Sequence, residues 1–231
     1  MVGYFKKPAR HLFSMILALS LCVVQPSANA QEHISSDRHY FIDIGFGVAT
    51  FQTSGRLIDN LPIPISKPHV ALRDHRIITF ELGRRLSPHW SISVRAGLPP
   101  TADLYGLGDF SDQGEFGKAK YGTIMMGGQY HLLSTGRFEP YIGAGLSYTL
   151  ILKARDRSIL NLDVNNTTGP YLRLGWRYGV TEKTDLLMDI TKLWQSFDAR
   201  GIAPGPYGPL PVSVRIKPDP VVVIFGISHR F

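Results

Sequence analysis

The sequence predicts an all-β protein: an eight-stranded antiparallel transmembrane β-barrel of the outer-membrane type, with four long extracellular loops and three tight periplasmic turns. Three observations predict it. Large apolar residues recur at every second position of short segments, the connections between these segments alternate between long and tight, and aromatic residues recur near the segment ends. The predicted organisation is a cleaved signal peptide, residues 1–30, followed by a single barrel, residues 31–231.

The first thirty residues have the pattern of an export signal. Lys6, Lys7 and Arg10 precede an apolar run, and the small residues Ala28 and Ala30 then mark a cleavage site after residue 30. The alternative is a retained anchor, but a run of about a dozen residues is too short for a transmembrane helix. The only cysteine lies within this run, so the mature chain is expected to have no disulfide.

Composition argues against nucleic acid and metal as partners. Three of the seven net positive charges lie in the signal region, and the remaining four are spread along the chain without a basic block. The sequence contains no H-E-x-x-H motif and no Cys/His cluster. We therefore expect no nucleic-acid binding and no cofactor.

Alternation with a period of two defines the strands. In residues 39–51, Tyr40, Ile42, Ile44 and Phe46 share one face, and the small or polar residues share the other. Residues 184–197 also fit an amphipathic helix, and the strand is preferred because the barrel needs an eighth one. The predicted strands are 39–51, 75–86, 90–98, 118–132, 138–152, 171–180, 184–197 and 213–231.

The connections set the orientation. Residues 52–74, 99–117, 153–168 and 196–212 are long, whereas 86–89, 133–136 and 180–184 are tight. Long extracellular loops and short periplasmic turns are typical of outer-membrane barrels. A soluble barrel shares the period but directs its apolar face inward, and here the opposite face is rich in Gly, Ser, Arg, Asp and Glu.

Aromatic residues recur on the predicted outer face, as in the girdles at membrane–water boundaries. Those near the turn end are Tyr40, Trp90, Tyr130, Phe138, Tyr178 and Phe231, and those near the loop end are Tyr148 and Trp194. The last strand therefore faces lipid. Its terminal Phe231 also resembles the signal that the barrel-assembly machinery reads, which makes that machinery a predicted partner.

The predicted inner face has two zones. An eight-stranded barrel leaves room only for side chains or one small ligand, so charges enclosed there must pair. The predicted charged plug near the periplasm comprises Asp43, Glu81, Arg85, His131, Glu139, Arg177, Asp185, Asp189 and Arg230. The predicted pocket above it comprises Ala49, Phe51, Thr79, Gly97, Thr123, Met125, Thr149, Ile151, Leu193 and Val222, and Arg95 and Arg173 are placed between the two zones.

Four stretches resemble the OmpW family of small outer-membrane proteins: RAGLPPTADLYGLG (95–108), GTIMMGGQYHL (122–132), RFEPYIGAGLSYT (137–149) and DPVVVIFGISHRF (219–231). The resemblance implies an eight-stranded barrel in the bacterial outer membrane with a narrow apolar channel. It also implies uptake of small hydrophobic molecules and, for some members, a role as receptor for toxins or phage.

The expected function is passive passage of a small hydrophobic solute through the apolar lumen. Outer-membrane lipids and lipopolysaccharide are the expected surroundings. Pro99 and Pro100 end the third predicted strand and cannot donate ladder hydrogen bonds, so they mark a candidate lateral exit into the bilayer. The alternative is that these prolines only end a strand and that side chains fill the lumen.

Two other functions are compatible with the fold. The barrel could act as a non-transporting display or receptor protein, with Arg56, Lys67, Arg73, Arg155, Arg157 and Arg200 in its loops. It could also be an acyl hydrolase acting on lipid A, although no G-x-S-x-G motif occurs and the adjacent Ser228 and His229 point to opposite faces. We therefore expect no enzymatic activity.

Overall fold

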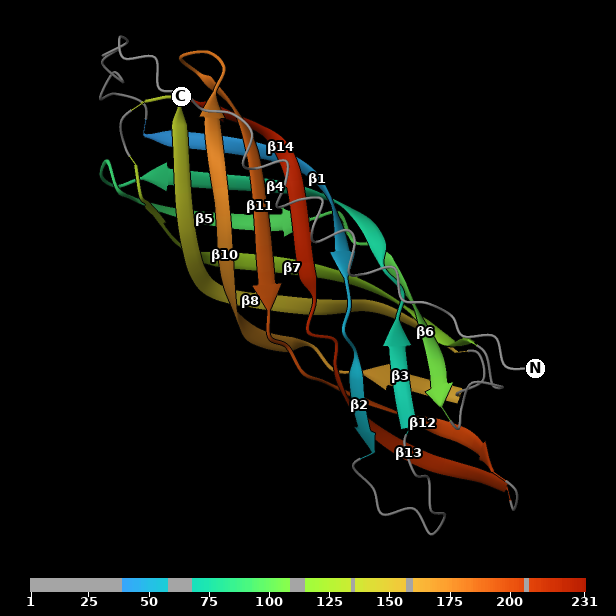
Figure 1. The fold of residues 1–231 in the computed structure, drawn as a ribbon. Coiled ribbons are helices and arrows are strands. Elements are labelled where there is room, and N and C mark those ends of the chain that lie inside the picture. Colours follow the sequence, from blue (N-terminus) through green and yellow to red (C-terminus); the bar gives the residue numbers. More distant parts are fainter. Residues whose placement is uncertain (1–38, 58–67, 109–114, 134–135, 157–159, 206–207) are drawn as a thin grey trace, which may run out of the picture. The chain divides into compact units, whose positions relative to one another are not determined.

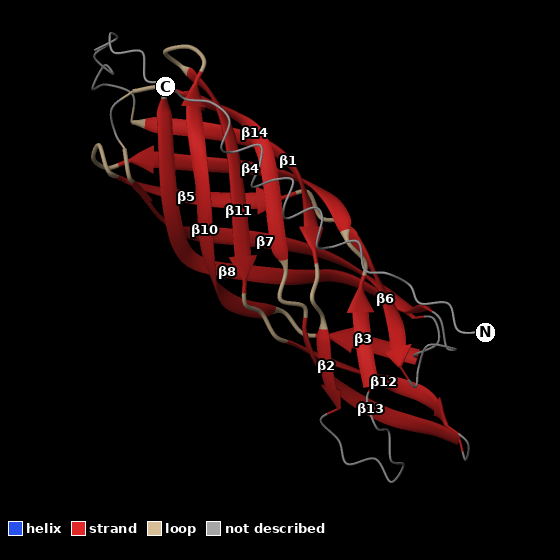
Figure 2. Cartoon of the chain, in the orientation of Figure 1, coloured by secondary structure: helices blue, strands red, loops and turns tan. Residues whose placement is uncertain are grey.

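The computed structural model describes residues 39–57, 68–108, 115–133, 136–156, 160–205 and 208–231, and all their regular elements are β-strands (Figures 1 and 2). The predicted signal peptide lies outside these residues. In the described part of the chain, no helix is both long and apolar enough to span a membrane.

Eight antiparallel strands close into a barrel, as the sequence predicts. Each pairs with the next barrel strand along the chain, and β14 returns to pair with β1, with Phe46 opposite Phe225. The pairing of β7 with β8 joins the two halves of the sheet. The barrel strands are β1 (Tyr40–Thr50), β4 (His75–Arg85), β5 (Trp90–Gly97), β7 (Glu115–His131), β8 (Phe138–Asp156), β10 (Thr167–Gly179), β11 (Thr184–Leu193) and β14 (Val221–Arg230).

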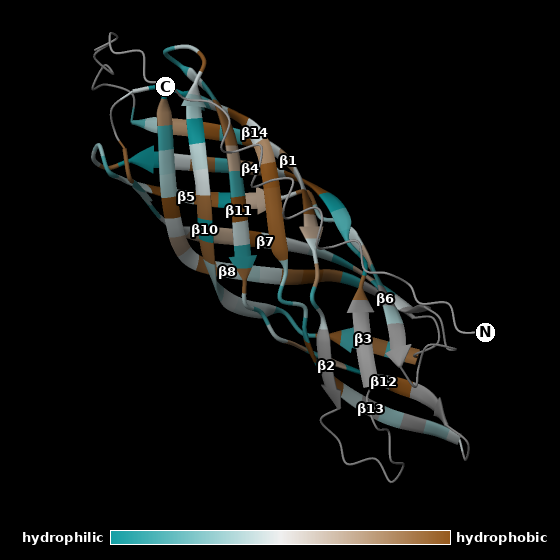
Figure 3. Cartoon of the chain, in the orientation of Figure 1, coloured by the Kyte–Doolittle hydropathy of each residue, from teal (hydrophilic) through white to brown (hydrophobic). Residues whose placement is uncertain are grey.

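Figure 3 shows hydrophobic and hydrophilic residues following one another along the barrel strands. The burial of the side chains separates an apolar outside from a polar inside. Ile42, Val94, Leu146 and Phe225 project outward and are 40–61% exposed, although all four are large and apolar. In β1, by contrast, the odd-numbered residues from Phe41 to Ala49 are buried. A protein in water would reverse this pattern, so the outer surface is suited to lipid.

The ambiguous segment 184–197 is a strand over Thr184–Leu193. It pairs with β10 on one side and with β14 on the other, and both ladders are needed to close the barrel. Backbone pairing thus overrides the helical spacing of its apolar residues, because an open edge would leave unpaired backbone groups in lipid. The strand ends at Leu193, and Phe197, at the start of the predicted loop 196–212, belongs to the next strand, β12 (Phe197–Gly205).

The long connections were predicted as loops and instead contain strands. β3 (Pro68–Leu72) and β6 (Thr101–Gly108) extend the barrel sheet from β7. A second sheet has the order β2-β13-β12-β9, which adds β2 (Ser54–Leu57), β9 (Leu160–Val164) and β13 (Gly208–Lys217). Strands therefore continue beyond the barrel on its extracellular side (Figure 1).

The last predicted strand, 213–231, is in fact two strands from different sheets. β13 ends at Lys217 and β14 begins at Val221, with Pro218 and Pro220 between them. Proline has no backbone N–H to donate to a ladder, and Asp219 has a left-handed φ of 39°. The chain therefore leaves one sheet and enters the other at this point.

The second sheet packs an apolar core against the extension of the barrel sheet. Ala199 of β12 and Ile216 of β13 are buried against Ala119 of β7. On an exposed part of the same hairpin, the Arg215 guanidinium donates two hydrogen bonds to the Asp198 carboxylate, at 2.7 and 3.0 Å, which lowers the pKa of that carboxyl.

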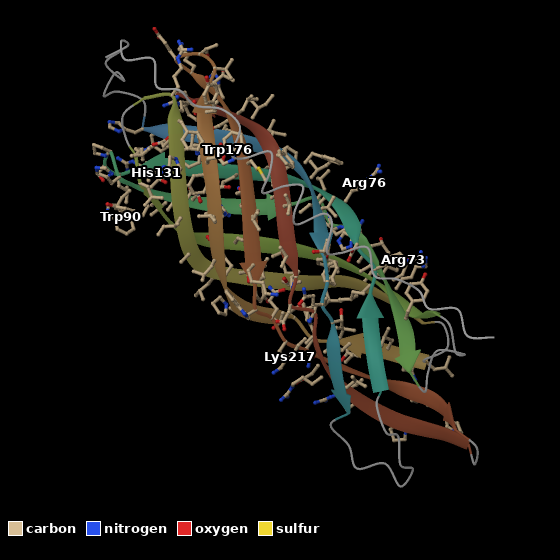
Figure 4. The ribbon with its side chains drawn as sticks, viewed as in Figure 1. Arg73, Arg76, Trp90, His131, Trp176 and Lys217 are labelled. Atoms are coloured by element: carbon tan, nitrogen blue, oxygen red, sulfur yellow. The ribbon has the colours of Figure 1, made fainter. Side chains whose placement is uncertain are left out.

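Aromatic pairs surround the turn end of the barrel. The ring centroids of Tyr40 and Phe231 lie 6.1 Å apart, and those of Trp90 and Tyr130 lie 5.0 Å apart. The backbone N–H groups of Tyr40 and Phe231 each donate to the other's carbonyl, at 3.1 and 2.9 Å. Figure 4 shows Trp90 and Trp176 at this end, and Arg73, Arg76 and Lys217 toward the other. The predicted lower girdle is therefore formed.

Glycines on the lumen side leave space for aromatic side chains. This packing gives a first prediction. A Cβ at Gly175 would lie 2.7 Å from the Tyr141 ring, the Met188 carbonyl oxygen and the Asp189 Cβ. Gly175→Ala should therefore destabilise the barrel by about 1–3 kcal/mol through overpacking. Urea unfolding in lipid vesicles measures this free energy.

The matched control is Gly128→Ala, because a Cβ there approaches only the Ser91 carbonyl oxygen, at 3.8 Å. It should change the free energy of unfolding by less than about 0.5 kcal/mol. Equal unfolding midpoints for the two alanine variants would contradict the packing described here.

Candidate functional site

The lower lumen is filled by a network of ion pairs centred on Arg95. Its guanidinium donates to both oxygens of Asp189, at 3.0 and 2.6 Å, and also pairs with Glu81. Glu81 in turn accepts from Arg173 at 2.8 Å. Arg95 lies on β5, Asp189 on β11, Glu81 on β4 and Arg173 on β10. The network therefore crosses the whole lumen and connects opposite walls.

Closer to the turn end, a second group of pairs completes the closure. Arg177 donates to both oxygens of Asp43, at 2.9 and 2.8 Å, and lies 4.3 Å from the centre of the Phe41 ring. Two further pairs, Arg85 with Glu139 and Arg230 with Asp185, lie nearby. We call the complete set of five arginines and five carboxylates the charged floor: Arg85, Arg95, Arg173, Arg177, Arg230, Asp43, Glu81, Glu139, Asp185 and Asp189.

The charged floor contains eight of the nine residues predicted as a plug, and the ninth, His131, contacts it through Glu139. Its formal charges cancel. The sequence placed Arg95 and Arg173 between the two zones. In the structure both arginines pair with Glu81, and Arg95 also lines the cavity above. The sequence did not show these partners, because the position of a Cα does not reveal how far a long guanidinium side chain reaches across a narrow lumen.

A serine, a histidine and a carboxylate meet at one side of the floor. Ser91 Oγ lies 2.8 Å from His131 Nε2, and His131 Nδ1 lies 3.3 Å from Glu139 Oε1. Nucleophile, base and orienting acid have this order in serine hydrolases. Ser91 and His131 are both 0% exposed, however, and Glu139 is already held by Arg85. The trio therefore supports the floor rather than facing a substrate.

Above the charged floor lies a cavity of about 130 Å³. Nine of the ten residues predicted for the pocket line it: Ala49, Phe51, Thr79, Gly97, Thr123, Met125, Ile151, Leu193 and Val222. The tenth, Thr149, is buried and hydrogen-bonded to Thr123 and Gln195 at 2.8 and 2.9 Å. Arg95 and Thr191 form part of the lower boundary, so the cavity rests directly on the charged floor.

Sequence reasoning missed the part of the cavity that extends past the barrel. Four of its lining residues lie in segments predicted as loops: Leu72, Ala102, Val164 and Phe197. Ala119 and Ile216 lie in predicted strands but were not assigned to the pocket. A signal was present in β13, where Val214 and Ile216 alternate with polar residues. Barrel alternation alone could not show that a second sheet turns this apolar side toward the same cavity.

The barrel wall is interrupted beside the cavity. The β5–β7 ladder ends with Ala96 opposite Ile124, and the β6–β7 ladder begins with Thr101 opposite Lys120. Pro99 and Pro100 occupy the interval, where one hydrogen bond joins the Tyr121 N–H to the Pro100 carbonyl at 3.2 Å. Pro100 also lines the cavity. The wall here is held by fewer backbone hydrogen bonds than the two ladders on either side, because neither proline has an N–H to donate.

The floor gives a second prediction, for Arg95→Met. This change leaves Asp189 buried without its guanidinium, and breaking a buried pair costs about 3–5 kcal/mol. The double variant Arg95→Met/Asp189→Asn should recover most of that loss, because the neutral amide can accept from one of the Tyr141 and Thr191 hydroxyls through its oxygen and donate to the other through its nitrogen. Urea unfolding in lipid vesicles provides the measurement.

Arg215→Met is the control, because it breaks an exposed pair and should change stability little. If Arg95→Met unfolded at the wild-type urea concentration, the floor would not have the structural role assigned to it.

Comparison with known proteins identifies the family. The model of the OmpW family matches residues 78–231. The chain is 29% identical over 158 residues to the dibenzothiophene metabolism operon protein PahQ of Pseudomonas aeruginosa, covering 68% of this chain and 72% of that protein. It is 26% identical over 162 residues to the outer membrane protein AlkL of Ectopseudomonas oleovorans, covering 70% and 69%.

Solved structures share the fold. The crystal structure of OprG from Pseudomonas aeruginosa superimposes with a TM-score of 0.75 at 17% identity, covering 84% of this chain and 96% of that one. The solid-state NMR structure of AlkL in lipid bilayers gives 0.65 at 22% identity, covering 90% and 97%. The family match, the outward apolar face and the closed barrel agree. The chain belongs to the OmpW family and is a β-barrel of the bacterial outer membrane.

Proposed function

We propose that the protein lets small apolar solutes enter the outer membrane by binding them in the cavity and then releasing them into the bilayer. The observation that supports this most directly is the apolar cavity between the charged floor and the extracellular sheet. A solute would enter from the extracellular side and displace water from apolar walls, which favours binding.

Cavity size suggests the class of solute. A volume of about 130 Å³ is similar to the roughly 150 Å³ apolar cavities that bind benzene. A solute burying roughly 150 Å² of apolar surface gains about 4 kcal/mol, which corresponds to a dissociation constant of about 1 mM. Such weak binding suits a passage that must also release its solute. We therefore propose single-ring aromatics and short alkanes as solutes.

The direction of release follows from the charged floor. A solute in the cavity meets paired, desolvated charges below it, and separating these pairs would be costly. The interrupted wall at Pro99 and Pro100 borders the same cavity and lies near the outer edge of the membrane. Sideways release through this wall is therefore the proposed exit.

The relatives support an apolar solute. PahQ is named for a dibenzothiophene metabolism operon, and dibenzothiophene is an apolar aromatic compound. The proposal includes no chemical step, because Ser91, the serine hydrogen-bonded to a histidine in the floor, has no exposed surface. Loops that only display a surface would not require a cavity.

The cavity proposal predicts the behaviour of Leu193→Arg. Leu193 is 4% exposed and lines the cavity, so an arginine there would fill the space and bring a charge into it. Affinity for fluorobenzene, measured by ¹⁹F NMR titration, should fall by about tenfold or more. Ala119→Leu, which narrows the cavity without adding charge, should weaken binding in the same direction.

Leu160→Arg is the matched control, because Leu160 is 57% exposed on β9. It should bind fluorobenzene like the wild type. Equal affinity in the wild type, Leu193→Arg and Ala119→Leu would exclude this cavity as the binding site.

The exit proposal predicts that Pro99→Ala/Pro100→Ala slows release. Alanines can donate the backbone hydrogen bonds that prolines cannot, which would extend the ladder against β7. The rate of solute transfer into the surrounding bilayer should fall several-fold, while affinity for fluorobenzene should change much less than in Leu193→Arg. Pro170→Ala, on the lipid-facing side of β10, is the control. An unchanged transfer rate in the double variant would refute lateral exit.

A further inference from the structure

Two lysines stand directly opposite each other on the outer wall, beyond the membrane-facing part of β7 and β8. In the register of these strands, Lys120 pairs with Lys153, and both side chains are exposed. Opposed like charges destabilise a strand pair. No hydrogen bond or ion pair within the described chain involves either ammonium group, and the nearby Asp103 carboxylate pairs with Lys118 at 3.1 Å. Among the residues that the structure describes, the arrangement therefore lacks an anion.

A β-bulge creates this pair. The register shifts between Lys120 and Tyr121, so that Tyr121 faces Ile151 and Leu152 is the additional residue. Ile151 lines the cavity, whereas Leu152 and Lys153 are both exposed. With regular alternation, Lys153 would point inward like Ile151, toward the apolar cavity. The bulge instead turns it outward beside Lys120, which is a known use of bulges.

The height of the pair matches the polar boundary of the membrane. Phe138 and Tyr148 are outward aromatics ten residues apart on β8, which at a tilt of about 40° corresponds to roughly 25 Å along the membrane normal. That is the height of the apolar band, so Tyr148 marks its outer limit. Allowing for the bulge, Lys153 lies about 10 Å higher, and a lysine stem can bend back toward the headgroups.

The surface below the lysines is apolar. Ile124 and Met126 on β7, and Leu146 and Leu152 on β8, are 41–63% exposed on the same side of the wall. A ligand that fits this strip must carry negative charge above and hydrocarbon chains below. Lipopolysaccharide, with phosphorylated sugars directly above its acyl chains, has this arrangement and forms the outer leaflet around the barrel.

We propose that Lys120 and Lys153 form a binding site for the phosphate groups of a lipopolysaccharide molecule held against the outer wall of β7 and β8. The bound phosphate supplies the missing counter-charge, and the acyl chains cover the apolar strip. Lysine suits this role because it acts as a point charge toward phosphate without needing a fixed geometry. This site is on the outside of the barrel and does not depend on what the cavity binds.

The test compares lipopolysaccharide binding by the full-length mature protein and by Lys120→Ser/Lys153→Ser. Purified protein in zwitterionic detergent is titrated with lipopolysaccharide, and bound molecules are counted by native mass spectrometry. Each lysine near an anionic surface contributes about fivefold in affinity, so the double variant should bind at least about tenfold more weakly. Without lipopolysaccharide it should unfold no more easily than the wild type, because a repulsion has been removed.

The control is Arg137→Ser/Lys183→Ser, which removes the same charge from exposed positions at the turn end. It should retain wild-type binding. Titrations with dephosphorylated lipid A and with inorganic phosphate separate the two parts of the ligand, and neither should match intact lipopolysaccharide. The proposal would be overturned if the lysine variant bound lipopolysaccharide as tightly as the wild type, or if the control variant lost as much affinity as the lysine variant. It would also be overturned if dephosphorylated lipid A bound as tightly as intact lipopolysaccharide, or if inorganic phosphate fully replaced it.

Discussion

The contact of Arg95 with both Glu81 and Asp189 is the constraint on which the lumen depends. It joins β5 to β4 and to β11 across the barrel, and Arg173 reaches the same glutamate from β10. A barrel in lipid gains no hydrophobic stabilisation from its outer face relative to the surrounding hydrocarbon. Its enclosed charges must therefore pair with one another, and here five arginines pair with five carboxylates, so that the formal charges of the floor cancel.

The charged floor closes the lower lumen and so sets the lower end of the cavity. The cavity begins where the last paired charge ends, and its walls change from barrel residues such as Leu193 to residues of the second sheet such as Ile216. The extracellular strands thus lengthen the apolar surface beyond the membrane. A solute that crosses the polar sugar layer on this surface stays shielded from water until it reaches lipid depth, which is the proposed path.

Breaks in regular pairing mark the places where the barrel departs from a plain cylinder. The prolines at 99 and 100 interrupt the wall beside the cavity, those at 218 and 220 transfer the chain between sheets, and the bulge at Leu152 turns Lys153 outward. Each break follows from ordinary backbone chemistry: a missing N–H or one additional residue. Each also lies near the outer edge of the membrane, where lipid, solute and polar sugars meet.

The sequence by itself determined the number of barrel strands, the outward apolar face, the aromatic girdle and the location of charge near the turns, because a period of two needs only neighbouring residues. The apolar spacing of segment 184–197 fits both a helix and a strand, and the need for an eighth barrel strand decided between them. Tertiary structure alone decided the partners of Arg95 and Arg173, the meeting of Ser91 with His131, and the second sheet that completes the cavity. These depend on the reach of side chains across a closed lumen and on pairing between distant segments, and neither leaves a periodic signal in the chain.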